Sequence, residues 1–410
     1  MLHVNKAAQR TPYPPELQSL MSVKTALEGQ DWIGNWSGLH RGATPLYEMP
    51  GLARHLGVFQ VYVKDESVRS PLGSFKALGA PLALARLILR LHSEKKFDPR
   101  GLFAGAYQEA LRPLTVVSAT DGNHGKGLAA AAMTMGCGCI IVLHANVSLE
   151  REQAIAQFGA KIVRIAGNYD ESVAEAARLA QQNGWHVVSD TSYEGYEDVP
   201  RDVMQGYGII AAELCEPDAP VFTHVFLQGG VGGLAAGISS YLWEKFGSQR
   251  PDFVVVEPEQ ADCLIQSAIS GQPAKATGSV DSVMAGLACG ETSPLAWRFL
   301  ATTVDTFVTI HDEDAIAAMR LLAHGSYGDC PIEAGESGVA GLAGLLELMA
   351  SPDAAKNAKL TSASRVLVIN TEGATAPEMY RSLLGVSAAE VLERQREWKT
   401  AHLNVNASAG

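Results

Sequence analysis

The chain has 410 residues, of which 47% are hydrophobic, and a formal net charge of −12 at pH 7. This length and hydrophobic content are enough for a large core and predict two domains. The acidic charge argues against a nucleic-acid partner, and without a secretory leader or a long apolar run we expect a cytoplasmic protein with no membrane segment.

Nine short runs rich in β-branched residues alternate along the chain with stretches of helical periodicity. This alternation is typical of parallel sheets that helices cover on both faces. Nine strands exceed one sheet of ordinary size, so we expect an α/β fold of two three-layer domains with mostly parallel sheets. The expected strands lie at 61–66, 114–120, 139–145, 161–166, 186–191, 223–228, 252–258, 306–310 and 365–370.

Lys76 is the first unusual residue in chain order. It lies in the stretch LGSFKALGA (72–80), between a turn-like segment at 71–73 and an apolar run of helical character. The first turn of a helix carries positive dipole character, so it is electrostatically the wrong place for an ammonium group. We therefore expect another group to hold this lysine.

The strand at 114–120 runs into the turn DGNHG (121–125), which a helix of small residues follows. A strand, a polar turn with glycines and a helix start form an anion-binding nest, although a plain capping turn has the same pattern. We expect His124 to have a structural role in this turn. Lys126, at the helix start, is expected to be solvated.

The strand at 223–228 is followed by four glycines within the five positions 229–233. Glycine lets the backbone approach an anion closely, and free N–H groups at a helix N-terminus can hold a phosphate. A dinucleotide site is the rival interpretation, because Gly230, Gly232 and Ala235 fit the pattern GxGxxA. Its acidic residue would be Glu257, which lies further along the chain than the usual interval of about 20 residues.

Two further strands end in polar residues, one at Asp190 and the other at Asn370, Thr371 and Glu372. Each of these ends alone is more typical of a turn cap than of a site. Together with Lys76 and a phosphate-binding turn, they indicate a pocket with carboxylates and an amine. This combination points to pyridoxal 5′-phosphate (PLP), an aldehyde cofactor that bonds to lysine and accepts electrons.

The cysteines indicate neither a disulfide framework nor a metal site. Six cysteines in a chain of this length are more typical of reduced thiols. Cys137 and Cys139 have no second pair of ligands nearby, so we expect them to be core thiols and predict no metal.

The sequence resembles the fold-type II PLP enzymes, the group of threonine dehydratase and tryptophan synthase β-subunit. The motifs are SFKALGA around Lys76, DGNHG around Asn123 and GGVGG at 229–233. Further strings narrow the resemblance to the diaminopropionate ammonia-lyase family. In chain order they are TDGNHGKG, GNYDESV, WHVVSDTSYEGY, VPRDVMQGY, THVFLQGGVGG, VEPEQADCL, MAGLACGE, AGESG and NTEGATAPE.

This resemblance implies a role for each cofactor-binding residue. Lys76 would bond to the aldehyde of PLP and later transfer protons, and Asn123 would hydrogen-bond the phenolic oxygen of the cofactor. Thr371 would face the pyridine nitrogen. Backbone N–H groups would bind the phosphate at Gly229, Gly230, Val231, Gly232 and Gly233.

The resemblance also implies the reaction, an α,β-elimination of ammonia from D- and L-2,3-diaminopropionate. It gives pyruvate and two molecules of ammonia through aminoacrylate. Asp121 stands where threonine dehydratases commonly have serine, and Asp190 would lie on the other side of the substrate. We infer that Asp121 deprotonates the D enantiomer and Asp190 the L enantiomer. Contacts with this small amino-acid substrate are expected at Ser74, Thr120, Tyr169 and Ser337.

The resemblance further implies a homodimer and a division of the chain. Residues 30–90 and 205–400 would form a larger, PLP-binding domain, and residues 91–204 a smaller one. Residues 1–29 would be an N-terminal extension and residues 401–410 a polar tail. The nearest alternative is a threonine or serine dehydratase or a related lyase of a β-substituted amino acid. A non-catalytic PLP-binding protein and an NAD-dependent dehydrogenase stay open.

Overall fold

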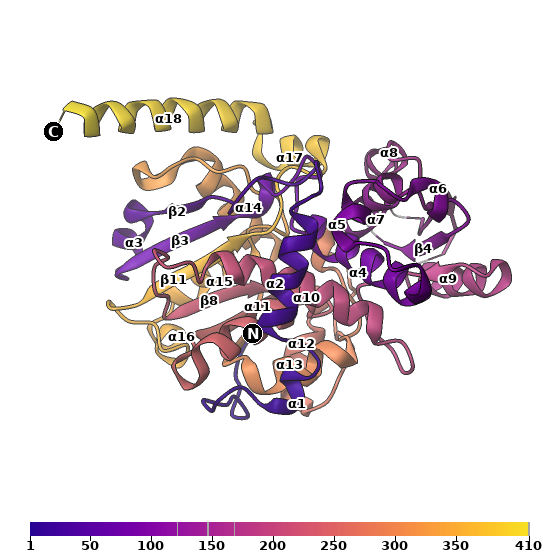
Figure 1. Ribbon diagram of the computed structural model, residues 1–410. Helices are drawn as coiled ribbons and strands as arrows, with labels where there is room; N and C mark the ends of the chain where they lie inside the picture. Colours follow the sequence, from indigo (N-terminus) through magenta and orange to yellow (C-terminus); the bar gives the residue numbers. More distant parts are fainter. Residues whose placement is uncertain (121, 146, 168, 409–410) are drawn as a thin grey trace.

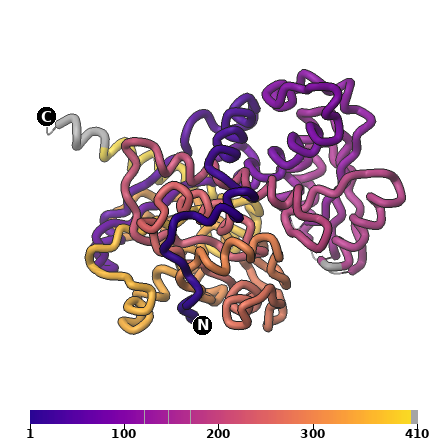
Figure 2. Tube along the Cα trace, turned by 60° about the horizontal axis from the view of Figure 1, so that its bottom comes forward, coloured from indigo at the N-terminus to yellow at the C-terminus, as the bar shows by residue number. Residues whose placement is uncertain are grey.

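The computed structural model describes residues 1–120, 122–145, 147–167 and 169–408. Its strands form a seven-stranded sheet and a four-stranded sheet. Figure 1 shows the smaller sheet, with strand β4 and helices α7 to α9, at one side of the larger sheet. In the turned view of Figure 2, the purple segment that contains β4 again lies at the edge of the molecule.

The larger sheet has the strand order β1-β10-β9-β8-β11-β3-β2. Its five inner strands run parallel, and β1 and β2 pair antiparallel at the two edges. The strands are β1 Leu2–Val4, β2 Leu46–Glu48, β3 Gln60–Asp65, β8 His224–Gln228, β9 Asp252–Pro258, β10 Thr306–Ile310 and β11 Arg365–Asn370.

The smaller sheet has the strand order β6-β5-β4-β7, and all its strands are parallel. Its strands are β4 Thr115–Ala119, β5 Gly138–Leu143, β6 Lys161–Arg164 and β7 His186–Val187.

Helices connect and cover these strands. The α-helices are α1 Pro15–Gln18, α2 Val23–Ile33, α3 Pro50–Leu56, α4 Lys76–Leu91, α5 Pro99–Phe103, α6 Gln108–Leu111, α7 Asn123–Met135, α8 Leu149–Ala156, α9 Tyr169–Asn183, α10 Asp198–Glu213, α11 Gly233–Phe246, α12 Cys263–Ser270, α13 Pro294–Thr303, α14 Asp312–His324, α15 Ala340–Met349, α16 Pro352–Asn357, α17 Pro377–Leu384 and α18 Ala388–Ser408. The 3-10 helices are η1 Glu66–Val68, η2 Ser93–Lys95, η3 Gly247–Gln249, η4 Glu259–Ala261, η5 Ala285–Leu287 and η6 Ser326–Gly328.

The inner strands are almost entirely buried, because helices cover both faces of the larger sheet. In β9, Phe253 and Val255 belong to one hydrophobic cluster, and Val254 and Val256 belong to another on the opposite face. Helices α4, α10 and α11 contribute to the first cluster, and α14 and α15 to the second. The first cluster also includes α7 and one face of the smaller sheet, so apolar packing joins the two sheets.

The predicted α/β fold with mostly parallel sheets is confirmed, and each of the nine predicted strands is present. Strands β1 and β2 were not predicted, because three residues give too little alternation to recognise a strand. β1 lies in the predicted N-terminal extension and pairs with β10, so part of that extension belongs to the larger sheet. The division into a domain at 91–204 and a second domain stays a prediction.

None of the helices in the described part of the chain has both the length and the apolar character that crossing a lipid bilayer requires.

Candidate active site

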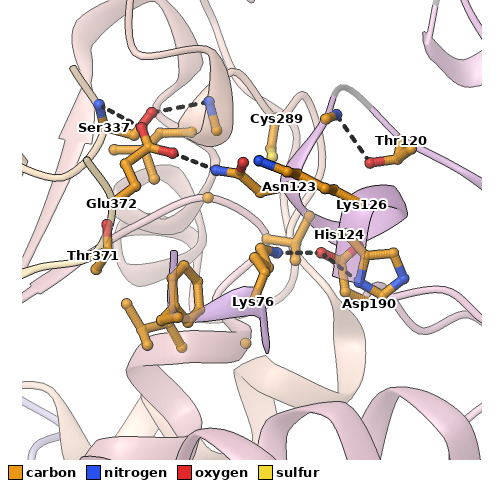
Figure 3. A pocket seen from close by; sticks show the side chains of 18 of the residues that line it. Lys76, Thr120, Asn123, His124, Lys126, Asp190, Cys289, Ser337, Thr371 and Glu372 are labelled. Carbon is orange, nitrogen blue, oxygen red and sulfur yellow. Dashed lines mark hydrogen bonds and ion pairs between the residues drawn. The ribbon is translucent and has the colours of Figure 1, made fainter. Parts of the chain in front are cut away.

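The candidate active site is a pocket between the two sheets, at the carboxyl ends of their parallel strands. The segments after β4 and β7 of the smaller sheet line it, as do those after β8 and β11 of the larger sheet and the start of α4. Open α/β sheets bind ligands at this end of their strands. Figure 3 shows Lys76, Asn123, Asp190 and Thr371 around this pocket.

Lys76 is the first residue of α4, and Asp190 holds its ammonium group. Lys76 Nζ lies 2.5 Å from Asp190 Oδ2 and 5.9 Å from the centroid of the Tyr207 ring. Burial alone would lower the pKa of Lys76, but the Asp190 carboxylate raises it above its ordinary value. The N-cap residue of α4, Phe75, makes no side-chain capping hydrogen bond within the described part of the chain. A carboxylate from another element therefore stabilises the cation at this unfavourable end of a helix.

Asp190 follows β7 in a loop and lies between Lys76 and His124. Burial alone would raise the pKa of Asp190, but the Lys76 ammonium lowers it below its ordinary value. His124 Nε2 donates to the carbonyl of Val188 at 2.9 Å, because a carbonyl oxygen only accepts. His124 Nδ1 lies 3.7 Å from Asp190 Oδ2 and has no hydrogen-bond partner among the described residues. Burial lowers the pKa of His124, so this neutral acceptor faces Asp190.

The turn after β4 places Asn123 at the start of α7. Thr120 Oγ1 accepts hydrogen bonds from the N–H groups of Gly122 at 3.1 Å and Gly125 at 3.2 Å. A Cβ at Gly125 would lie 2.3 Å from Thr120 Cγ2, so the close turn requires glycine there. Asp121, predicted to be catalytic, lies outside the described residues.

The glycine turn after β8 leads into the N-terminus of α11 at Gly233. A helix N-terminus leaves N–H groups without intrahelical acceptors, which suits a phosphate. Gly232 has φ +100°, and a Cβ there would lie 2.8 Å from Leu300 Cδ1. Gly229 differs from the prediction, because its N–H donates to Val256 O at 2.7 Å within the sheet and is not available to a phosphate. The residues of this turn that line the pocket are Gly230, Val231, Gly232 and Gly233.

Thr371 lines the pocket directly after the end of β11. Thr371 is 2% exposed, and its backbone carbonyl accepts a hydrogen bond from Phe75 N at 3.0 Å. This bond ties the end of β11 to the residue before Lys76. In Figure 3, Thr371 and Asp190 lie on opposite sides of Lys76.

Three of the four predicted substrate contacts line the pocket, namely Thr120, Tyr169 and Ser337. Ser337 Oγ accepts a hydrogen bond from Gly286 N at 3.0 Å. Ser74 is not part of the lining. It is buried beside the pocket, and its Oγ has no hydrogen-bond partner in the described part of the chain.

The prediction that Lys126 is solvated is wrong. Its Nζ donates to the carbonyl of Leu72 at 3.0 Å, and its side chain lines the pocket. Burial lowers the pKa of Lys126, against the opposing effect of Glu372. A position in the first turn of a helix is normally exposed, and no local pattern indicates that the 71–73 segment covers this one.

Arg151 is a pocket residue that the sequence analysis missed. It lies within α8, where helical periodicity carries no sign of a site. Arg151 Nη2 lies 3.0 Å from Glu336 Oε1, and this carboxylate is 1% exposed. Burial and the neighbouring Glu372 raise the pKa of Glu336 to about 7. The pair joins a helix of the smaller sheet to the 335–338 segment of the larger one.

The dinucleotide interpretation fails at Glu257. Its two carboxylate oxygens accept hydrogen bonds from the N–H groups of Leu264 and Ile265, each at 2.8 Å. The side chain is fully buried and holds the N-terminus of α12. It therefore cannot bind a ribose hydroxyl.

The described residues contain no group of three or more His, Cys, Asp or Glu side chains that could hold a metal ion. Cys137 and Cys139 pack within the first hydrophobic cluster.

A lysine between two parallel α/β sheets, an amide-bearing turn and a glycine turn at a helix N-terminus together define an enzyme site for PLP. The family model described as pyridoxal-phosphate dependent enzyme matches residues 38–372. This match covers most of the chain, so the chain belongs to the family of PLP-dependent enzymes.

The relatives confirm the narrower resemblance. The chain is 37% identical to the diaminopropionate ammonia-lyase of Salmonella typhimurium, over 83% of this chain and 87% of that one. A structure of holo diaminopropionate ammonia lyase from Escherichia coli has a TM-score of 0.84 and 34% identity, and covers 94% of this chain and 96% of that one. The same enzyme in complex with an aminoacrylate-PLP azomethine reaction intermediate has a TM-score of 0.83, with the same identity and coverage.

The residues of the pocket fit PLP. Lys76 supplies the amine, and the backbone at the start of α11 supplies N–H groups for the phosphate. A Cβ at Gly230 would lie 3.3 Å from Cys289 Sγ, so a side chain there would crowd the pocket wall. Within the described residues, Gln228 Oε1 and His124 Nδ1 are buried in the lining without a hydrogen-bond partner. Such acceptors are expected where a polar ligand completes the site.

Proposed function

We propose that the protein is a PLP-dependent carbon–nitrogen lyase that converts D- and L-2,3-diaminopropionate and one water into pyruvate and two molecules of ammonia. The observation that carries this proposal is the Lys76–Asp190 pair, 2.5 Å apart, in a chain that spans 87% of a curated diaminopropionate ammonia-lyase. A carboxylate beside the cofactor lysine gives the pocket a base for the α-proton of the substrate.

PLP supplies, when bound, the electron sink that makes the α-proton of an amino acid acidic. Asp190 is the proposed acceptor of that proton from the L enantiomer, because its carboxylate lies beside the cofactor lysine. His124 Nδ1, 3.7 Å from Asp190 Oδ2, is an acceptor to which the protonated carboxyl can donate. Lys76, once displaced by the substrate, is an amine that can pass a proton to the leaving nitrogen.

Asp121 is the proposed base for the D enantiomer, acting from the other face of the substrate. This assignment rests on the family resemblance. Asp121→Asn is expected to lose activity on the D enantiomer and Asp190→Asn on the L enantiomer, each by about 10²-fold or more. Steady-state rates of ammonia release from each pure enantiomer test the assignment. Equal losses on both enantiomers in the Asp190 variant would show that the two-face scheme is wrong.

The cofactor contacts follow from the same pocket. Asn123 is proposed to hydrogen-bond the phenolic oxygen of PLP, and the N–H groups between Gly230 and Gly233 to bind its phosphate. Thr371 is proposed to face the pyridine nitrogen. A hydroxyl at this position leaves the ring a weaker electron sink than a carboxylate would, and this suits an elimination in which the leaving group takes the electrons.

The test of the proposed function combines a spectrum with product analysis. The purified protein loaded with PLP is expected to show a visible absorption band and to release pyruvate and ammonia in a ratio of about 1:2 from diaminopropionate. L-threonine and L-serine serve as competing substrates. If ammonia came only from serine or threonine, the alternative of a dehydratase would replace this proposal. A PLP-loaded protein that turns over none of the three would be a binding protein.

We also propose that the protein is a homodimer, as the family resemblance implies, and that it acts in the cytoplasm, as the sequence analysis predicts. Sedimentation of the holoenzyme measures the first, and cell fractionation the second.

A further inference from the structure

Glu372 is a pocket residue that connects several segments of the chain. Glu372 follows Thr371 after the end of β11 and is 4% exposed. Figure 3 shows its carboxylate between the amide of Asn123 and the backbone at Ser337. A buried carboxylate needs hydrogen-bond donors, so its partners determine what it does.

The two oxygens of the carboxylate accept hydrogen bonds from three segments. Glu372 Oε2 accepts a hydrogen bond from Asn123 Nδ2 and one from Thr375 Oγ1 at 3.5 Å. Glu372 Oε1 accepts one from Ser337 N at 3.2 Å. An ionised carboxylate can only accept, so the end of the Asn123 amide that meets it is the nitrogen. The contact with Glu372 thus decides which way the amide of Asn123 is turned.

The backbone of Glu372 is fixed as well. Its carbonyl accepts a hydrogen bond from Gly335 N at 2.9 Å, and it forms an isolated β-bridge with Ser74. A Cβ at Gly335 would lie 2.4 Å from the carbonyl of Gly373, so the 335 segment packs tightly against this residue. Because Ser74 is two residues before Lys76, the same residue orients Asn123 and is attached to the lysine segment.

We propose that Glu372 is a positioning residue that acts through Asn123. It takes one hydrogen of the Asn123 NH₂ group and thereby fixes the amide so that the second hydrogen is directed into the cofactor site. The acceptor there is the phenolic oxygen of PLP, so this inference rests on the proposed contact between Asn123 and the cofactor. Without Glu372 the amide can turn its oxygen toward that phenolic oxygen, and two acceptors would repel.

The test measures cofactor binding and does not require turnover of diaminopropionate. PLP is titrated into the apoprotein of the wild type, Glu372→Ala, Asn123→Ala and the double variant, and the visible absorption band gives Kd. Each single variant is expected to weaken PLP binding about tenfold, as the loss of one hydrogen bond does. The double variant is expected to bind as weakly as Asn123→Ala alone, because Glu372 acts through that residue.

Two controls separate positioning from a general structural role. Glu333→Gln changes a nearby carboxylate that accepts a hydrogen bond from Ala374 N instead of from Asn123, and it should bind PLP like the wild type. Glu372→Gln keeps the shape but has one acceptor oxygen in place of two. It should weaken PLP binding by less than the alanine variant while the melting temperature of its apoprotein matches the wild type. The pH at which the visible band of the bound cofactor changes should shift in both Glu372 variants.

The proposal is wrong if the effects of Glu372→Ala and Asn123→Ala on Kd add in the double variant. It is also wrong if both Glu372 variants retain the wild-type Kd and the wild-type pH dependence of the band. A protein that binds PLP as described but does not act on diaminopropionate would refute the proposed function and leave this inference standing.

Discussion

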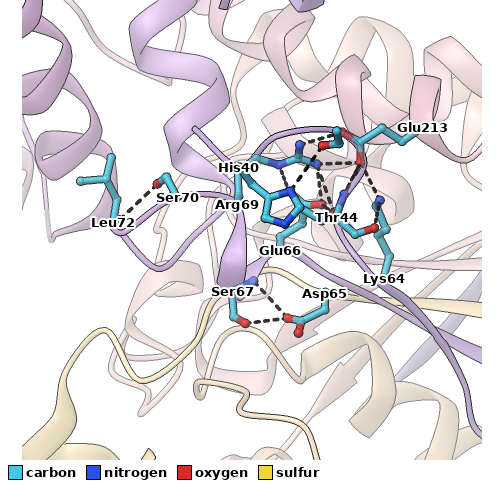
Figure 4. Close-up of polar contacts among 11 residues, drawn as sticks. His40, Thr44, Lys64, Asp65, Glu66, Ser67, Arg69, Ser70, Leu72 and Glu213 are labelled. Carbon is cyan, nitrogen blue, oxygen red and sulfur yellow. Dashed lines mark hydrogen bonds and ion pairs between the residues drawn. The ribbon is translucent and has the colours of Figure 1, made fainter. Parts of the chain in front are cut away.

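Two buried groups of charged side chains differ in how completely their charges are matched. One is the pocket. The other, here called the closed cluster, consists of Thr44, Lys64, Glu66, Arg69 and Glu213 (Figure 4), each at most 7% exposed. Both contain carboxylates and cations, so composition alone does not separate them.

In the closed cluster every charge faces an opposite charge. Arg69 contacts both carboxylates, with Nε 2.7 Å from Glu66 Oε2 and Nη1 2.6 Å from Glu213 Oε1. Lys64 Nζ lies 2.5 Å from Glu213 Oε2, and Thr44 Oγ1 donates to Glu66 at 2.6 Å. Burial alone would raise the pKa of Glu213, but Arg69 and Lys64 lower it below its ordinary value. Two cations thus neutralise two anions.

In the pocket, only some of the buried charged and polar groups have a partner within the described residues. Lys76 and Asp190 pair, but His124 Nδ1, Gln228 Oε1 and the neighbouring Ser74 Oγ are buried without a hydrogen-bond partner within the described ranges. Buried polar groups are otherwise nearly always satisfied in native proteins. The difference indicates that the closed cluster holds the fold together, whereas the pocket is completed by a ligand.

The largest expected effect is in the pocket, at Lys76. Lys76→Ala removes the amine that bonds to PLP and a proton-transfer group together, so activity should fall by about 10⁴-fold. The visible band of the bound cofactor should disappear or shift, while the protein stays folded. Absorption spectra and rates of pyruvate release check this. A variant that kept the wild-type band would show that another residue bonds to the cofactor.

A substitution in the closed cluster should instead reduce the stability of the protein. Arg69→Met leaves Glu66 and Glu213 without their shared cation and should reduce the free energy of unfolding by about 3–5 kcal/mol. Denaturant unfolding of the apoprotein measures this. In the double variant Arg69→Met with Glu66→Gln, one cation and one anion are removed, so part of the stability should return. Stability that falls further in the double variant would mean that charge balance does not govern this cluster.

The fold and most of the site could be predicted from the sequence because their signals are local. Strand ends mark Asp190 and Thr371, and glycine spacing marks the turn before α11. The sequence could not show that Gly229 uses its N–H within the sheet, because that bond depends on the register of β8 against β9. It could not show that the 71–73 segment covers Lys126 either, since this contact joins distant parts of the chain.

Arg151 and the closed cluster were missed for a related reason. Arg151 lies in a helix and the four charged residues of the cluster lie on a strand, a 3-10 helix with its flank and α10. A charged residue within a helix or strand is normally solvent-exposed, so only the packing of these elements reveals which charges are buried.

A smaller effect is expected at His124. His124→Gln removes the acceptor that faces Asp190, so the protonated carboxyl should be less favoured and the rate on the L enantiomer should fall by about tenfold. Because Gln can still donate to Val188 O, the turn should keep its place. The measurement is kcat against pH for each enantiomer. A similar loss on the D enantiomer would instead indicate a general effect on the asparagine turn.

The smallest effect is a pH dependence of stability at Glu336. Burial and Glu372 raise the pKa of its carboxyl to about 7, so between pH 5 and 7 the folded protein keeps a proton that the unfolded chain releases. This contribution to stability is present in acid and is lost as pH rises toward 7. Glu336→Gln cannot titrate, so the stability of the wild type relative to this variant should fall from pH 5 to 8, by about 1 kcal/mol or more. Unfolding free energies at several pH values, with the exposed Glu347→Gln as control, measure it. If the unfolding free energies of the wild type and Glu336→Gln changed in parallel with pH, Glu336 would titrate alike in the folded and the unfolded chain. Its carboxylate would then already be ionised and paired with Arg151 at pH 5.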